Sequence, residues 1–262
     1  MPHVLVAGKI HEQGVALLRS APGITFDLMD EVSVASYAPL VGKADGIVIR
    51  TQPLPASVIA DAGRLRIVSR HGVGYDAVDV AALNARRIPL AIVGDVNSRA
   101  VAEHTLMLML GVARRVVAYD AASRSDRWAV RNRFEGGELD GKTLLLIGFG
   151  RIGRRVSSLA QAFGMTVLAY DPLVGADAID AAGAVPLDRI EKGLPQADFV
   201  SLHMPGSPSG AILGPRELAM LRPSAIVVNT ARGGLVDEAA LAAALAAGKL
   251  RGAGLDVLAE EP

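Results

Sequence analysis

The feature that most constrains the fold is an alternation of short apolar segments with amphipathic segments along nearly the whole chain. In the first part, the strand-like runs VLVA (4–7), GIVIR (46–50) and LRIVSR (65–70) are separated by helix-compatible stretches such as VALLRS (15–20) and VDVAALNARR (78–87). Strands that alternate with helices at this spacing form a parallel sheet covered by helices. This part of the chain therefore predicts a doubly wound α/β unit.

A second series of strand-like runs follows a polar, glycine-rich stretch at 131–142. Its members are TLLLIG (143–148), TVLAY (166–170), DFVSLH (198–203), AIVVNT (225–230) and RGAGLDV (251–257). They are enough for a second complete parallel sheet. We therefore predict an α/β protein of two Rossmann-like or flavodoxin-like doubly wound parallel-sheet domains, 1–96 and 97–262.

The segment between the two series, residues 98–124, has a helix-compatible sequence throughout, and Asn97 or Ser98 can cap its start. A helix of about 25 residues would be about 37 Å long, which exceeds the width of a small domain. We therefore expect one long helix that leaves the first domain, enters the second and joins the two.

The composition narrows the class of partner. The 262 residues carry a formal net charge of zero, so the chain lacks the basic excess expected of a surface for nucleic acid or for an anionic membrane. The longest apolar run in a helical context, TLMLMLGVA, is far shorter than the roughly 18 residues that a membrane span needs. There is no cysteine and no secretory signal pattern, which fits a cytoplasmic protein, and no metal site is predicted. The expected partner is a small molecule.

The strongest local motif is LLLIGFGRIGRRV (144–156), in which Gly148, Gly150 and Gly153 form G-x-G-x-x-G between a strand and a helix. Gly148 permits a tight turn, Gly150 lets the backbone approach a pyrophosphate, and Gly153 lets helix and strand pack closely. Phosphates would then lie at the helix N-terminus, where free N–H groups point. The motif predicts a dinucleotide-binding site.

Asp171 ends the next strand, about 20 residues beyond the glycine turn. A carboxylate at this position can accept hydrogen bonds from both hydroxyls of a ribose, and it would repel a 2′-phosphate. The sequence therefore predicts NAD rather than NADP as the cofactor.

Several longer motifs resemble those of one protein family. They are NSRAVAEHTLMLML (97–110), LLLIGFGRIGRRV (144–156), ADFVSLHMPGSPSGAILG (197–214), LRPSAIVVNTARGGLVDEAAL (221–241) and GAGLDVLAEEP (252–262). In this order they resemble the D-isomer-specific 2-hydroxyacid dehydrogenases, nearest to the D-3-phosphoglycerate and hydroxypyruvate-reducing branch. The resemblance implies hydride transfer between NAD(H) and a small 2-hydroxy or 2-oxo acid. It further implies a substrate-binding domain at 1–96, an NAD-binding domain at 97–262 and a homodimer built around the helix at 98–124.

The resemblance also implies which residues act on the substrate. Arg232, in NTARGG, matches the catalytic arginine of the family, whose planar fork suits bidentate binding of an oxo acid. Glu261 matches the glutamate that pairs with the catalytic histidine and keeps that histidine protonated. Taken by itself, a glutamate in AEEP is more often a solvated loop residue.

Other residues match positions around the cofactor and the substrate. In the second domain they are Gly148, Gly150, Arg151, Ile152 and Gly153 at the glycine turn, Asp171 at the ribose, His203 beside the cofactor, Met204 and Pro205 on the adenine side, Thr230 and Ala231 near the nicotinamide, and Asp256 as the partner of the nicotinamide carboxamide. In the first domain they are Arg50, Arg70, Gly72, Val73 and Gly74 in the substrate loops. Arg50 and Arg70 have two equally favoured interpretations: they bind a substrate phosphate, or they are charged residues that face the solvent. Val73 stands where some phosphoglycerate enzymes carry a hydroxyl, which weakens the phosphate interpretation.

The catalytic histidine of the family lies beyond the EEP segment, and none of the five histidines present stands in that context. We expect the protein to continue past Pro262, supplying this histidine and the segment that returns to complete the first domain. The alternatives are a truncated binding module with little catalysis, or a corepressor-like protein that binds NAD and peptides. The lack of a proline-rich or charged extension favours the enzyme.

Overall fold

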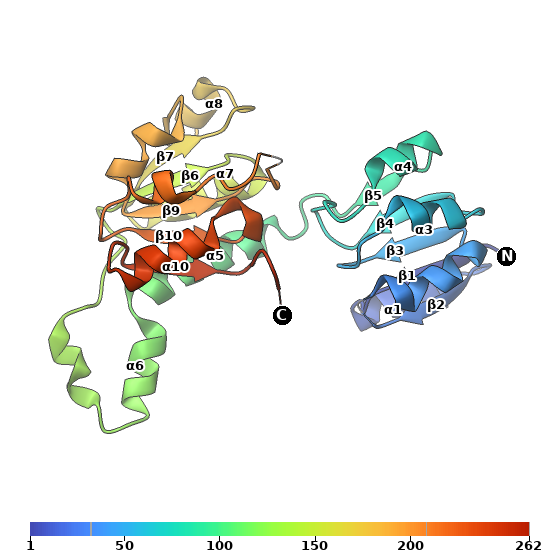
Figure 1. Ribbon diagram of the computed structural model, residues 1–262, viewed down its shortest axis with the longest axis horizontal. Helices are drawn as coiled ribbons and strands as arrows, with labels where there is room; N and C mark the ends of the chain where they lie inside the picture. The colour runs from blue at the N-terminus through green and yellow to red at the C-terminus, as the bar shows by residue number, and fades with distance from the viewer. Residues whose placement is uncertain (32, 208, 262) are drawn as a thin grey trace. The chain divides into compact units, whose positions relative to one another are not determined.

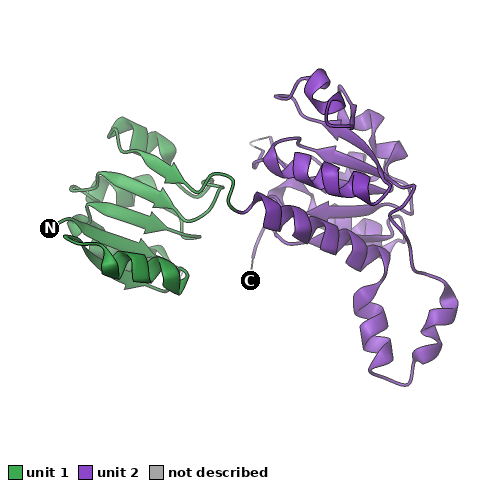
Figure 2. Cartoon of the chain, turned by 180° about the vertical axis from the view of Figure 1, so that it is seen from behind, with its two compact units in different colours: residues 1–96 green, residues 97–262 purple. Residues whose placement is uncertain are grey.

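A computed structural model describes residues 1–31, 33–207 and 209–261, and Figure 1 traces the chain. The chain divides into two compact units, Met1–Val96 and Asn97–Pro262, which Figure 2 shows in different colours. Pro262, the last residue of the EEP segment, lies outside the described residues. Each unit contains one wholly parallel sheet, as the alternating pattern predicts.

The first unit contains a five-stranded sheet in the order β2-β1-β3-β4-β5, which is the flavodoxin-like arrangement. Its strands are β1 (His3–Ala7), β2 (Thr25–Met29), β3 (Gly46–Ile49), β4 (Ile67–Arg70) and β5 (Leu90–Ile92). Its helices are α1 (Glu12–Ser20), α2 (Val34–Tyr37), the 3₁₀ helix η1 (Ala38–Lys43), α3 (Ala56–Asp61) and α4 (Val80–Ala85). Leu5, Ile47 and Val68 are buried in one core with side chains from η1, α3 and α4.

The second unit contains a six-stranded sheet in the order β11-β10-β9-β6-β7-β8, which is the Rossmann arrangement with β6 as its first strand. The strands are β6 (Thr143–Ile147), β7 (Thr166–Tyr170), β8 (Val185–Pro186), β9 (Phe199–Leu202), β10 (Ile226–Asn229) and β11 (Gly252–Leu255). The α-helices are α5 (Ser98–Ala113), α6 (Val116–Ser123), α7 (Arg151–Ala162), α8 (Ala176–Asp180), α9 (Pro215–Leu218) and α10 (Glu238–Ala246). The 3₁₀ helices are η2 (Trp128–Arg133), η3 (Ile190–Lys192), η4 (Leu194–Gln196) and η5 (Gly233–Leu235).

Strand β6 is apolar from Leu144 to Ile147 because both faces of its sheet are covered. Leu144 and Leu146 are buried in a core with side chains from α5, α7 and α8. Leu145 and Ile147 point to the opposite face, where they are buried with side chains from α9, α10 and η4. The continuous run TLLLI is therefore the pattern of a central strand between two helical layers.

The helix expected over 98–124 is two helices, because α5 ends at Ala113 and α6 begins at Val116. Between them, Arg115 has a left-handed φ of 53°. The carbonyl of Ala113 accepts hydrogen bonds from the N–H of Gly137 at 2.8 Å and from the guanidinium of Arg251 at 3.2 Å. Groups from elsewhere in the unit thus cap α5, and helical periodicity alone does not reveal them.

The prediction that a long helix joins the two units was wrong. The chain passes between them through a turn at 94–97, and α5 begins immediately afterwards. Ala102, Leu106 and Met109 of α5 pack in the core of the second unit, so this helix belongs to that unit. Among the described residues, no helix has both the length and the apolar character needed to cross a membrane.

Candidate cofactor-binding and active site

The candidate site lies at the carboxyl edge of the second sheet, on both sides of β6. Strand β6 pairs with β7 on one side and with β9 on the other, so the chain reverses its direction of winding here. In open α/β sheets, ligands bind in the crevice at such a switch point. A dinucleotide bound there would extend one nucleoside over β7 and the other over β9, β10 and β11.

The three glycines of the turn after β6 meet different constraints. Gly148 has a φ of 102°, and a Cβ there would lie 2.5 Å from the carbonyl oxygen of His203. A Cβ at Gly153 would overlap the carbonyl oxygen of Gly148. At Gly150, by contrast, no atom outside the adjoining residues lies within 4 Å of the Cβ position. Packing within the protein does not require glycine at 150, and the open space fits the approach of a pyrophosphate.

The start of α7 supplies the donors for such a phosphate. Gly150 is the N-cap residue, and it has no side chain that could accept from the first-turn N–H groups, which are therefore left for a ligand. Arg151 is exposed at the first helical position, and Ile152 packs partly against the core. Arg154 donates through Nε to the carbonyl of Phe149 at 3.2 Å, which holds the turn against the helix.

Asp171 follows β7 directly and is hydrogen-bonded to the glycine turn. Its Oδ2 accepts from the N–H of Phe149 at 2.7 Å, and its Oδ1 accepts from the N–H of Leu173 at 2.8 Å. Each carboxylate oxygen can accept more than one hydrogen bond, so both keep capacity for ribose hydroxyls. The half-buried position and this geometry fit the ribose of NAD.

His203 follows β9 and forms one wall of the glycine turn through its carbonyl oxygen. Its ring Nε2 lies 2.9 Å from Oγ of Ser201. Burial lowers the pKa of His203 to about 4, so the ring is neutral at neutral pH. Met204 packs partly against the core, whereas Pro205 is exposed.

Asn229, at the end of β10, shapes the turn that carries Arg232. Its side-chain Nδ2 donates to the carbonyl of Arg232 at 2.7 Å, and its Oδ1 accepts from the N–H of Ala231 at 3.0 Å. Arg232 is half-buried, and its Nη1 donates to the carbonyl of Ala231 at 2.6 Å. Sequence reasoning did not single out Asn229. The signal for it is an amide at the end of an apolar strand, where the side chain is buried.

The segment after β11 packs on this same turn. A Cβ at Gly233 would overlap the carbonyl of Leu258, so the two backbones are in close contact. The N–H of Ala259 donates to a carboxylate oxygen of Glu238 at 2.6 Å. Glu261 is exposed, three residues beyond Leu258.

Thr230 and Asp256 lie at the ends of two adjacent strands. The N–H of Asp256 donates to the carbonyl of Asn229 at 2.9 Å, so Asp256 stands beside Thr230. Oγ1 of Thr230 lies 3.0 Å from Oγ1 of Thr105, and Oδ1 of Asp256 lies 3.2 Å from Nε2 of His104. The structure thus brings Thr230, Ala231, Arg232 and Asp256 to one stretch of the sheet edge.

The residues predicted in the first unit gather at the carboxyl edge of that unit's own sheet. Arg50 follows β3, and its Nη1 donates to the carbonyl of Lys9 at 3.2 Å. Arg70 ends β4, and its Nη1 donates to the carbonyl of His71 at 2.6 Å. A Cβ at Gly72 would lie 2.6 Å from the same Nη1, so the guanidinium lies over this glycine.

The loop at 72–74 is half-buried, and Val73 and Gly74 continue it from Gly72. Nearby, the amide of Gln52 is buried and donates through Nε2 to the carbonyl of Glu31 at 3.3 Å. A Cβ at Gly8 would lie 2.6 Å from this amide, so Gln52 ties together the loops after β1, β2 and β3. Sequence reasoning missed Gln52, because a glutamine in a loop gives no sign that it will be buried.

The fold and the glycine turn define a dinucleotide-binding α/β protein, and comparison with known proteins identifies its family. Residues 106–262 match the family model described as "D-isomer specific 2-hydroxyacid dehydrogenase, NAD binding domain". The chain belongs to the D-isomer-specific 2-hydroxyacid dehydrogenase family, and the matching domain is the one that binds NAD.

Individual relatives agree with this assignment. The D-3-phosphoglycerate dehydrogenase of Mycobacterium tuberculosis is 42% identical over 265 residues, which are 100% of this chain and 49% of the relative. A solved structure from Thermus thermophilus has 36% identity and a TM-score of 0.89, covering 99% of this chain and 83% of its own. The D-lactate dehydrogenase of Aquifex aeolicus, complexed with NAD and lactic acid, has 26% identity and a TM-score of 0.89, with coverages of 98% and 77%. The chain spans about half the length of the curated relatives it matches.

Proposed function

We propose that this chain carries the substrate-binding unit, 1–96, and the NAD-binding unit, 97–262, of a D-2-hydroxyacid dehydrogenase. The reaction is hydride transfer between NAD(H) and a small D-2-hydroxy or 2-oxo acid, and the nicotinamide, when bound, supplies or accepts the hydride. The observation that most supports this function is the place of Arg232 on the same sheet edge as the glycine turn, at the end opposite Asp171. A cation there lies on the nicotinamide side of the site.

The residues have distinct tasks in this proposal. Arg232 binds the carboxylate of the acid and polarises its carbonyl, because a guanidinium offers parallel donors and a fixed positive charge. Asn229 holds the turn that presents Arg232. Asp171 binds the adenosine ribose and disfavours a 2′-phosphate, so we expect NAD rather than NADP. Glu261 is the proposed partner of a catalytic histidine.

The substrate is proposed to be of the 3-phosphoglycerate type or of the hydroxypyruvate and glyoxylate type. The names of the D-3-phosphoglycerate dehydrogenase relatives support the first. Arg50 and Arg70, at the carboxyl edge of the first sheet, would bind the phosphate of such a substrate. Their bonds to backbone carbonyls support a fixed orientation for both guanidinium groups.

The test is NADH oxidation by the full natural protein with 3-phosphohydroxypyruvate, hydroxypyruvate, glyoxylate and pyruvate. We expect turnover with at least one acid, and we expect Arg232→Lys to lower kcat/KM by about 100-fold because it loses the planar fork. The affinity for NADH should stay unchanged in this variant. Lys249→Ala, an exposed change after α10, is the control. NADH binding without reduction of any acid would instead favour the NAD-binding module, and no NADH binding would contradict both functions.

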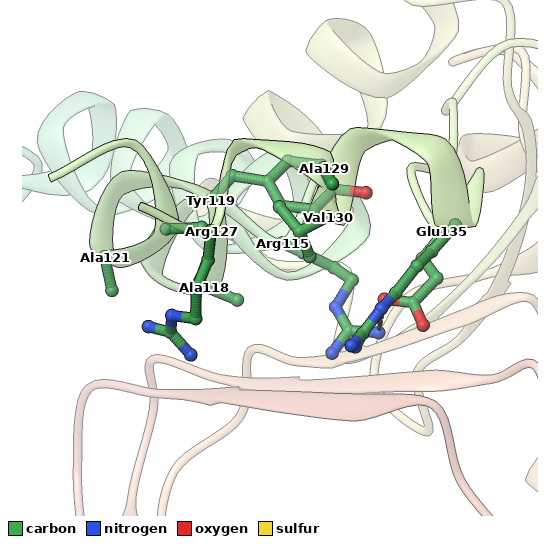
Figure 3. Close-up of a pocket in the computed structure, with 10 residues that line it drawn as sticks. Arg115, Ala118, Tyr119, Ala121, Arg127, Ala129, Val130 and Glu135 are labelled. Atoms are coloured by element: carbon green, nitrogen blue, oxygen red, sulfur yellow. Dashed lines mark ion pairs between the residues drawn. The ribbon is translucent and has the colours of Figure 1, made fainter. Parts of the chain in front are cut away.

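We further propose a homodimer formed through the α6–η2 hairpin, residues 116–135, which extends away from the sheet of its own unit (Figure 1). The hairpin exposes large apolar side chains, with Val117 at 85%, Trp128 at 61% and Phe134 at 89%. It also borders an open cavity of about 500 Å³ whose lining includes Tyr119 and Val130. Figure 3 shows Arg115 and Glu135, which form an ion pair beside this cavity. Such a patch supports association with a second copy.

A cytoplasmic location is also part of the proposal, and the absence of cysteine supports it.

A further inference from the structure

Along the contact between helix α5 and strand β11, each strand residue that faces the helix meets one residue of the helix. A Cβ at Gly252 would lie 2.5 Å from the side chain of Val112, and a Cβ at Gly254 would lie 3.0 Å from that of Leu108. One step further along both elements, Oδ1 of Asp256 lies 3.2 Å from Nε2 of His104. The strand positions are spaced by two residues and the helix positions by four, which are the repeats of a strand face and a helix face.

This register explains why His104 reaches Asp256. The two glycines of β11 leave room for α5 to approach the strand closely, since any larger residue would meet Leu108 or Val112. His104 lies one turn before Leu108 on the same face of α5. The contact with Asp256 is therefore set by the packing of two regular elements, which distinguishes it from a chance pair of flexible surface charges.

The backbone of Asp256 is also fixed. Its N–H donates to the carbonyl of Asn229, at the end of the neighbouring strand, over 2.9 Å. The adjacent residue of α5, Thr105, contacts Thr230 at the end of β10 through hydroxyl oxygens 3.0 Å apart. Consecutive side chains of one helix thus hold the ends of two strands on the nicotinamide side of the glycine turn.

The carboxylate of Asp256 remains open to a ligand. Its side chain is 50% exposed and that of His104 is 40% exposed. Within the described part of the chain, the second oxygen of Asp256, Oδ2, has neither a hydrogen bond nor an ion pair. A ligand donor that reached the end of β11 would meet this oxygen.

We propose that His104 is a positioning residue for the nicotinamide. It holds Oδ1 of Asp256, so that Oδ2 faces the crevice and accepts a hydrogen bond from the carboxamide N–H₂ of the cofactor. This inference rests on the proposed NAD-dependent function and on the role of carboxamide partner that the family resemblance implies for Asp256. His104 itself touches neither the cofactor nor the substrate, and it acts through the orientation of one carboxylate.

The test compares NADH with ADP-ribose, which lacks the nicotinamide, by calorimetric titration of the intact protein. His104→Leu removes the ring nitrogen at similar volume. It should weaken NADH binding about fivefold to tenfold, as expected when the hydrogen bond between Asp256 and the carboxamide is lost. Binding of ADP-ribose should change less than twofold. His104→Gln, whose amide N–H₂ can approach Asp256, should recover most of the NADH affinity. The control Glu103→Gln changes the neighbouring exposed side chain, which pairs with Arg99 at 3.0 Å, and it should change neither affinity.

The possible outcomes separate the inference from the function on which it rests. If the wild-type protein binds neither NADH nor ADP-ribose, the proposed function fails and the inference fails with it. If the wild type binds NADH and His104→Leu binds it equally well, only the inference is overturned. An equal loss of NADH and ADP-ribose affinity in His104→Leu would also overturn it, because His104 would then support the whole site. Melting temperatures of all variants identify any that fail to fold.

Discussion

The carboxylate of Asp171 accepts a hydrogen bond from the backbone N–H of Phe149 over 2.7 Å, so the residue that follows β7 also braces the turn that follows β6. Phe149 stands between the first two glycines of that turn, and its ring is fully buried. The proposed ribose acceptor is therefore part of the structure that shapes the pyrophosphate site. Changes at Asp171 should therefore affect the binding of both the ribose and the pyrophosphate of a dinucleotide.

Replacing Asp171 tests this double role. We expect Asp171→Ala to weaken NADH binding about 10- to 100-fold, because hydrogen bonds to charged groups are worth about 1.5–3 kcal/mol. Asp171→Asn keeps an oxygen that can accept from Phe149, so it should retain more affinity for NADH while losing discrimination against NADPH. Titration of both cofactors into each protein measures these effects, with Asp180→Ala on α8 as the control. Equal affinity of the wild type for NADPH and NADH would contradict the role of Asp171.

The glycine turn offers a matched pair of substitutions. Gly150→Ala places a methyl group where no protein atom outside the adjoining residues lies within 4 Å, so we expect normal stability. NADH binding should weaken at least about tenfold, since the methyl occupies the path of the pyrophosphate. Gly153→Ala forces a Cβ onto the carbonyl oxygen of Gly148, so we expect a loss of about 1–3 kcal/mol in the free energy of unfolding. Thermal melts and NADH titration separate the two effects. Wild-type affinity in Gly150→Ala would place the pyrophosphate elsewhere.

The parts of this site that were predictable are encoded in short contiguous segments. Gly148, Gly150, Gly153 and Asp171 belong to one strand, turn, helix and strand, so their spacing alone indicates a dinucleotide site. The strand pattern likewise predicts two parallel sheets, because runs such as TLLLI are apolar on both faces.

The parts that were missed depend on groups that are distant in sequence. Helix α5 stops at Ala113, whose carbonyl accepts hydrogen bonds from Gly137 and Arg251. Neither residue lies near Ala113 in the sequence. The role of Asn229 depends on the course of the turn after β10, and the partner of His104 depends on the register between α5 and β11. Periodicity places residues on a face of an element, but it does not specify which residue of another element they meet.

His203 should make the stability of the protein depend on pH. Its pKa is about 4 in the folded state against an ordinary value of 6.5, because burial disfavours the charged ring. Below pH 6.5 the unfolded chain binds a proton that the folded chain does not, so stability is full above that pH and falls as the pH drops toward 4. The shift corresponds to a loss of about 2 kcal/mol at pH 5 relative to pH 8.

Urea unfolding of the cofactor-free protein at pH 8 and pH 5 measures this loss. His203→Asn has no ring to titrate, so the difference between the two pH values should shrink by about 2 kcal/mol in this variant. Ser201→Ala keeps the ring but removes its hydroxyl neighbour, and it should retain the full pH dependence of the wild type. An identical pH dependence in His203→Asn and the wild type would show that other groups cause it.

The apolar surface of the α6–η2 hairpin should hold two copies of the chain together. Val117 is 85% exposed on α6, and a carboxylate introduced there would have to lose its water on association. We therefore expect Val117→Asp to halve the molar mass measured by light scattering. For the 262 residues described by the sequence, the mass would fall from twice 27.2 kDa to 27.2 kDa. Leu17→Asp, an equally drastic change at an exposed position of α1, should leave the dimer intact. Because the hairpin projects from its own sheet and carries none of the proposed cofactor contacts, NADH affinity in the monomeric variant should match that of the wild type. A wild-type protein that is monomeric at micromolar concentration would refute this interface.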